Sequence, residues 1–95
     1  MASVGLLTLE IYIPGIGSLK EKRGLVKPII ARIRHEFNVS VAEIEDMDQL
    51  SHMVIGVAAV SSSADYVHGL LQRVAQSVED WRLDAELVDY TIEML

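Results

Sequence analysis

The basic residues of this sequence are concentrated in one short segment. Segment 20–36 has a charge of +4 (six basic minus two acidic residues), whereas the remainder has −10 (two basic minus twelve acidic). The formal total of −6 therefore conceals a strong segregation of charge. Such segregation predicts a place where an anionic partner binds. The six basic residues of the segment are Lys20, Lys22, Arg23, Lys27, Arg32 and Arg34.

The spacing of these residues predicts that most of them share one helix face. At 100° per residue, Lys20, Arg23, Lys27 and Arg34 fall within a sector of about 60°, beside the apolar stripe of the same helix. A row of cations can line phosphates, and backbone N–H groups of segment 14–18 could add to such a site. Binding to phosphates is salt-dependent and largely sequence-tolerant. The predicted anion- or RNA-binding residues are Lys20, Lys22, Arg23, Lys27 and Arg34.

The same basic face has a second interpretation. It could be a solvated surface whose positive charge balances the acidic remainder of this chain or of a second subunit. The protein would then be a homo-oligomeric structural or small-anion-binding module with no nucleic-acid role. A sequence pI near 4.8 argues against general duplex binding, which uses a broad basic surface. RNA readout on a sheet is also disfavoured, because segment 53–60 has no aromatic residue on which bases could stack.

Metal and cofactor chemistry find little support in the residue types. The chain has no cysteine, so it has no disulfide, thiolate nucleophile or thiolate metal ligand. His35, His52 and His68 stand singly, without ligand spacing. The acidic residues between 43 and 48 are typical of an edge strand protected by charge. We therefore expect no metal site and no cofactor.

No catalytic residue can be nominated from the sequence. It shows no Ser/His/Asp order, no Cys/His pair and no paired carboxylates. One enzymatic alternative is an acylphosphatase-like hydrolase, which binds phosphate where the first strand meets the first helix through backbone N–H groups and an Arg. Here Arg23 lies a full turn inside the predicted helix, and no Asn follows in segment 53–60 to position water.

Hydrophobic periodicity predicts six elements in one domain, residues 1–95. Strands are expected at 4–13, 38–46, 53–60 and 83–94, with helices following the N-cap Ser18 and the serines at 61–63. The order β-α-β-β-α-β predicts a ferredoxin-like α+β sandwich. Two helices would cover one face of a four-stranded antiparallel sheet of order 4-1-3-2. Pro28 interrupts the first helix, so we expect a kink there or a separate first turn before a helix that begins at Pro28.

The second face of this sheet has no helix to cover it. Apolar residues make up 51% of the chain and mean hydropathy is +0.30, which is high for a small domain. The surplus is expected on the bare face, with Val4, Leu6, Tyr12 and Tyr90. We therefore predict a homodimer joined through the open sheet face or an adjoining strand edge. Without a leader or a long apolar run, we expect a cytoplasmic protein and no membrane partner.

Several segments together resemble a bacterial family. They are 5–9 (GLLTL), 13–15 (IPG), 18–23 (SLKEKR), 37–43 (FNVSVAE) and 56–61 (GVAAVS). In this order they resemble the YlxP-like proteins, family 503 among the domains of unknown function. The resemblance implies a ferredoxin-like fold, a cytoplasmic location, gene neighbours that serve translation and ribosome maturation, and no established enzymatic activity. Together with the charge segregation, it favours a non-enzymatic factor that binds RNA or a ribosomal particle.

The chain departs from this family at two places. After Asp48 the family typically has a Trp followed by polar or basic residues, where Gln49 to His52 stand here. The family also usually lacks a proline at position 28. A function that depends on that Trp is therefore not expected of this protein.

Overall fold

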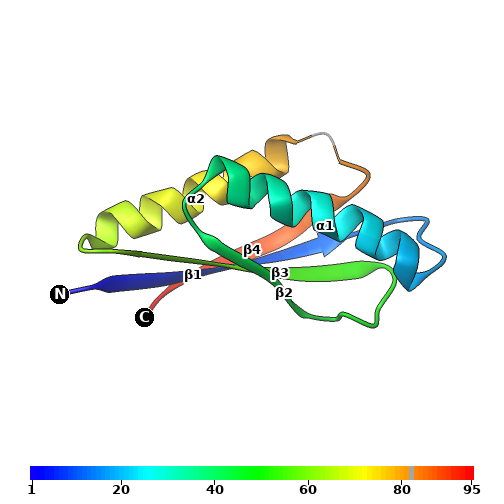
Figure 1. Cartoon of the computed structure of the whole chain (residues 1–95), viewed down its shortest axis with the longest axis horizontal. Helices are drawn as coiled ribbons and strands as arrows, with labels where there is room; N and C mark the ends of the chain where they lie inside the picture. Colours follow the sequence, from blue (N-terminus) through cyan, green and yellow to red (C-terminus); the bar gives the residue numbers. More distant parts are fainter. Residues whose placement is uncertain (82) are drawn as a thin grey trace.

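A computed structural model describes residues 1–81 and 83–95 and confirms the predicted ferredoxin-like α+β fold. The four strands form one antiparallel sheet of order β2-β3-β1-β4, which is the predicted order. Both helices lie on the same side of this sheet (Figure 1). The elements are β1 (Ser3–Tyr12), α1 (Leu19–Glu36), β2 (Ser40–Glu45), β3 (His52–Ser61), α2 (Ala64–Asp80) and β4 (Glu86–Met94).

Strand β1 lies in the interior of the sheet, between β3 and β4, and one of its faces is wholly apolar. Leu7, Leu9 and Ile11 point to the helices and are fully buried, whereas Leu6 and Glu10 alternate with them on the open face. The buried residues form one core between the sheet and the helices. Alternation along β1 thus predicted correctly which face is covered.

The two helices begin at the predicted caps. Ser18 Oγ accepts a hydrogen bond from the Glu21 N–H at 3.2 Å, and Ser63 Oγ accepts one from the Tyr66 N–H at 3.2 Å. From these caps, each helix turns an apolar stripe toward the sheet. Over residues 1–81 and 83–95, no helix combines the length and the apolar character that crossing a membrane requires.

Helix α1 continues through Pro28, so the expected separate first turn and a helix beginning at Pro28 are wrong. Pro28 has no N–H to donate to the Gly24 carbonyl, which would be costly in a buried segment. Both residues are exposed, and nothing lies within 4 Å of the place where a Gly24 Cβ would stand. Water can therefore donate a hydrogen bond to the Gly24 carbonyl, which receives none from Pro28.

Strand β4 contains a bulge that the sequence pattern did not reveal. It begins at Glu86 rather than Leu83, and its pairing with β1 shifts between Glu10 and Ile11. The shift changes which alternate residues face the helices, so Leu87 and Ile92 both pack on the core. Tyr90 was expected on the open face, but it pairs with the buried Leu9 and so lies on the helix side.

Candidate functional site

Four of the five predicted anion-binding residues share the exposed flank of α1. We call Lys20, Arg23, Lys27 and Arg34 the basic face; all four are exposed. Three of them, Lys20, Lys27 and Arg34, follow one another at intervals of seven residues, or about 10 Å along a helix axis. The basic face is therefore a straight row of cations that can contact several phosphates of one strand.

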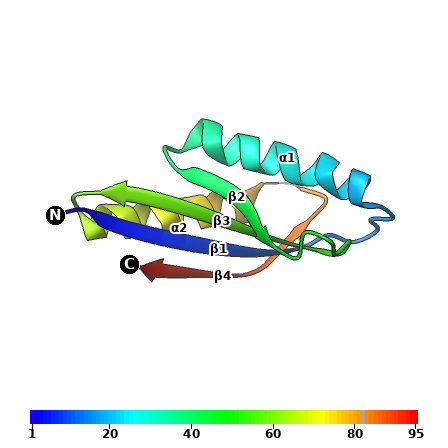
Figure 2. The same ribbon diagram turned by 60° about the horizontal axis from the view of Figure 1, so that its bottom comes forward.

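Arg34 fixes this flank relative to the sheet. Its Nη2 donates a hydrogen bond to the Val41 carbonyl at 2.9 Å, and Val41 belongs to the edge strand β2. Helix α1 packs against β2, as the view of the sheet from its open side shows (Figure 2). The basic face thus lies beside one edge of the sheet. Arg34 thus makes an anchoring contact and is still exposed as a residue.

The cations of the basic face are not neutralised by this chain's own acids. Within residues 1–81 and 83–95, ion pairs form between Lys22 and Glu43 at 3.0 Å and between Arg32 and Glu36 at 3.2 Å, and neither includes the basic face. A solvated helix face neutralised from within the molecule would show such pairs. The charge of the basic face is therefore available to an external anion.

Lys22, the fifth predicted residue, lies in the interior instead. Its side chain is 2% exposed, its Nζ donates to the Asp46 carbonyl at 2.6 Å, and the same Nζ lies 3.0 Å from Glu43 Oε2. Lys22 precedes the buried Val26 and Ile29 by four and seven residues, which is the spacing of an apolar stripe. That spacing was visible in the sequence and marks Lys22 as a residue that cannot reach a ligand.

The Lys22 contacts hold the loop after β2 against α1. Asp46 has a φ of 57°, in the left-handed region that non-glycine residues seldom adopt. Glu43 Oε2 is buried and accepts no hydrogen bond within the described residues, so the Lys22 ammonium is its charge partner. The segments 18–23 and 37–43 thus meet at this ion pair, which gives them a structural role.

Arg32 lies on the opposite flank of α1 and also has partners. Its guanidinium stands 4.1 Å from the centroid of the Trp81 ring, a cation–π contact, and it pairs with Glu36. Arg32 and Trp81 line a hollow of about 180 Å³ together with Leu25 and Leu83. Arg32 therefore belongs to the contact between α1 and the segment after α2, and not to the basic face.

The loop before α1 has acidic residues beside it. A hollow of about 500 Å³ beside it is lined by Pro14, Gly15 and the carboxylates of Glu21 and Asp84. Two acidic residues at this hollow disfavour an anion there, and the expected contribution of the loop N–H groups stays a prediction. Gly15 has a φ of 75°, which a turn explains without a ligand.

Residues of the other candidate chemistries lie apart from one another. Arg23 is exposed in the second turn of α1, and β3, which is described throughout, has no Asn. The acylphosphatase-like arrangement is therefore not assembled. His35, His52 and His68 belong to three different elements, and within the described residues no group of three His, Asp or Glu side chains could hold a metal ion.

Comparison with known proteins gives a family and a fold. The family model described as "Protein of unknown function (DUF503)" matches residues 4–92. A protein of Bacillus subtilis (strain 168), "Uncharacterized protein YlxP", is 40% identical over 78 residues, which are 82% of this chain and 85% of the relative. The solved structure "De novo designed protein Foldit4" matches with a TM-score of 0.59 at 12% identity, covering 100% of this chain and 97% of the other. That structural likeness shows the fold alone.

Proposed function

This chain belongs to the DUF503 family, and on that premise we propose that it is a non-enzymatic cytoplasmic factor that binds RNA, free or within a ribosomal particle, through the basic face of α1. One observation carries the proposal. Lys20, Arg23 and Lys27 are exposed on one flank, and within the described residues they form no ion pair with this chain's acids. Their charge is available to phosphates.

The charge around the basic face supports a single strand as the ligand. Outside segment 20–36 the chain has −10, so a polyanion is attracted only along the flank of α1 and is repelled elsewhere. A row of cations spanning about 20 Å from Lys20 to Arg34 fits one phosphate backbone. Four such contacts predict a slope of log affinity against log salt of about −3, from about −0.7 per contact on single strands.

Fluorescence anisotropy with a labelled single-stranded RNA, measured at two salt concentrations, tests the proposal. The variant Lys20→Ala/Arg23→Ala/Lys27→Ala keeps Arg34 and its contact with Val41, so the fold should be preserved. We expect its affinity to fall by about tenfold or more at low salt and its salt slope to drop to about −1. Wild-type affinity in this variant would refute RNA binding by the basic face.

Two single substitutions provide a matched control. Lys27→Ala and Arg73→Ala each remove one exposed cation from a helix, but Arg73 lies on α2, away from the basic face. We expect only Lys27→Ala to weaken RNA binding, since a general charge effect would lower both affinities equally. If inorganic phosphate competes as well as an equal concentration of RNA phosphate, the site is a small-anion site instead.

A further inference from the structure

The open face of the sheet is divided into an uncharged part and an acidic part. On β1, β2 and β3, cross-strand pairs place Leu6, Ala58 and Ser40 in one row, and Val4 lies beside Val60 at the N-terminal end of β1. On the far side of Leu6, this row ends at Glu93 of β4, which borders the uncharged part. A second row holds Asp89, Glu10, Val54 and Glu45. We call the first part the uncharged patch; it consists of Val4, Leu6, Ser40, Ala42, Ile44, Ala58 and Val60.

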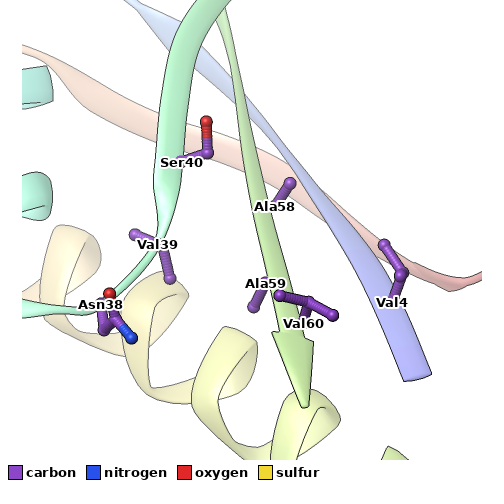
Figure 3. Close-up of a pocket in the computed structure, with 7 residues that line it drawn as sticks. All are labelled: Val4, Asn38, Val39, Ser40, Ala58, Ala59 and Val60. Carbon is purple, nitrogen blue, oxygen red and sulfur yellow. The ribbon is translucent and has the colours of Figure 1, made fainter. Parts of the chain in front are cut away.

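The uncharged patch has a recess beside a protrusion. Two hollows of about 380 and 170 Å³ open onto it, and both are lined by Ser40 and Ala58. Figure 3 shows Ser40, Ala58 and Val4 on three adjacent strands around the larger hollow, with Val60 next to them. Val60 is 69% exposed, so an apolar side chain stands in solvent beside a hollow whose lining includes the small residues Ser40, Ala58 and Ala59.

We infer that the uncharged patch binds the same patch of a second copy in a two-fold dimer. A two-fold axis brings each surface onto itself, so a patch that holds both a protrusion and a recess is self-complementary. Val60 of each copy can enter the hollow over Ser40 and Ala58 of the other. The seven residues of the uncharged patch can be buried in this way without removing a charge from water, provided that the contact stops short of Glu93 on β4.

The neighbouring acidic row favours a second copy over a nucleic acid or a basic protein as the partner of the uncharged patch. Glu10 stands directly opposite Asp89, and the like charges of this row would repel a nucleic acid on this face. A basic partner would be drawn to the acidic row and away from the uncharged patch. A second copy that slid toward that row would set carboxylate against carboxylate. Charge thus confines self-association to the uncharged end of the face.

The available area predicts a reversible dimer. Four strands about 4.8 Å apart and ten residues of about 3.3 Å each give the whole face roughly 600 Å². A stable interface usually buries about 800 Å² per partner, and the uncharged patch is only part of the face. The dimer should therefore exchange with monomer at micromolar concentrations. It leaves the helices on its outer sides, so both basic faces stay free.

Light scattering across low to high micromolar concentrations tests the inference on the whole chain. The mass should rise from 10.5 kDa toward twice that value. Val60→Asp should weaken the dimer at least tenfold. The matched control is Val88→Asp, because Val88 is a similarly exposed strand valine (61% against 69%) on β4, outside the uncharged patch. We expect Val88→Asp to associate as the wild type does.

Two results would overturn the inference. One is a wild-type mass that stays at 10.5 kDa at every concentration, which would leave the uncharged patch to a different occupant. The other is a dimer that Val88→Asp breaks and Val60→Asp leaves intact. Cysteine cross-linking gives an independent check, because the chain has no cysteine of its own. Oxidised Ala58→Cys should form a covalent dimer and Val88→Cys should not; the reverse would also contradict the inference.

Discussion

At the scale of single residues, Lys22 is a basic residue that contributes to the stability of the fold and not to the binding surface. Lys22 is a neighbour in sequence of Arg23, yet it pairs with Glu43 inside the molecule while Arg23 faces solvent. Removing one member of a buried ion pair leaves the other charge without compensation, whereas replacing both by apolar residues can be nearly neutral. The pair therefore stabilises the fold without contributing to the basic face.

Lys22→Met should lower the free energy of unfolding by about 3 kcal/mol, because Glu43 then stays partly buried without its ammonium partner. The double variant Lys22→Met/Glu43→Leu should regain most of that loss. Urea denaturation of the wild type, Lys22→Met, Glu43→Leu and the double variant measures both effects. Additive losses in the double variant would show that the two side chains are not energetically coupled.

The cation–π contact of Arg32 predicts a smaller effect. Arg32 is half-exposed, so Arg32→Ala should cost only about 0.5–1 kcal/mol, mainly through the lost contact with Trp81. Trp81 is the sole tryptophan, so its fluorescence emission reports directly on this contact. RNA affinity should fall less than in Lys27→Ala. An equal loss would extend the binding surface to the other flank of α1.

At the scale of elements, α1 tolerates two helix-breaking residues because both face water. Gly24 and Pro28 are exposed, and the apolar stripe beneath them is uninterrupted. Glycine in a strand has the opposite role where elements pack closely. A Cβ at Gly5 would lie 2.7 Å from Val67 and 2.8 Å from Leu71, so α2 approaches β1 only because a side chain is missing there.

Gly24→Ala and Gly5→Ala should therefore change stability in opposite directions. The first gains helix propensity without a clash and should stabilise the protein by about 0.5–1 kcal/mol. The second forces α2 away from β1 and should cost about 1–3 kcal/mol. Thermal unfolding of the two variants measures the difference. A stabilised Gly5→Ala would mean that Val67 and Leu71 can shift at little cost.

At the scale of the whole molecule, the two proposed surfaces belong to different layers: the basic face to α1 beside the β2 edge, and the uncharged patch to the open face of the sheet. The basic face is on the helix side and the uncharged patch is on the open side. A dimer joined through the open faces would then carry two basic faces, one on each copy. A short RNA can reach one of them, whereas a longer RNA that spans both gains avidity.

Val60→Asp should therefore leave the affinity for a short RNA unchanged and weaken binding of a long RNA. The reason is that each monomer keeps its own basic face and loses only the second point of attachment. Competition between short and long unlabelled RNA in the anisotropy assay measures both. If the short RNA loses affinity as well, the dimer interface and the RNA site are not independent.

The sequence alone determined those features that depend on neighbours along the chain. Alternation in β1 and the serine caps rest on local periodicity and local hydrogen bonds, and they predicted the covered face of the sheet and the starts of the helices correctly. The strand order followed from the order of the elements and from right-handed crossovers. The same periodicity placed Lys20, Arg23 and Lys27 on one exposed flank. It also placed Lys22 in the apolar stripe, although its charge concealed that position.

Tertiary structure decided the features that depend on partners far away in the chain. Glu43 comes 21 residues after Lys22, so a helical spacing could not show that a buried ammonium would find a carboxylate. The bulge in β4 depends on pairing with β1, and it let Leu87 and Ile92 share the core although their spacing sets them on opposite faces. The recess beside Val60 likewise exists only because β1, β2 and β3 bring small and large side chains together.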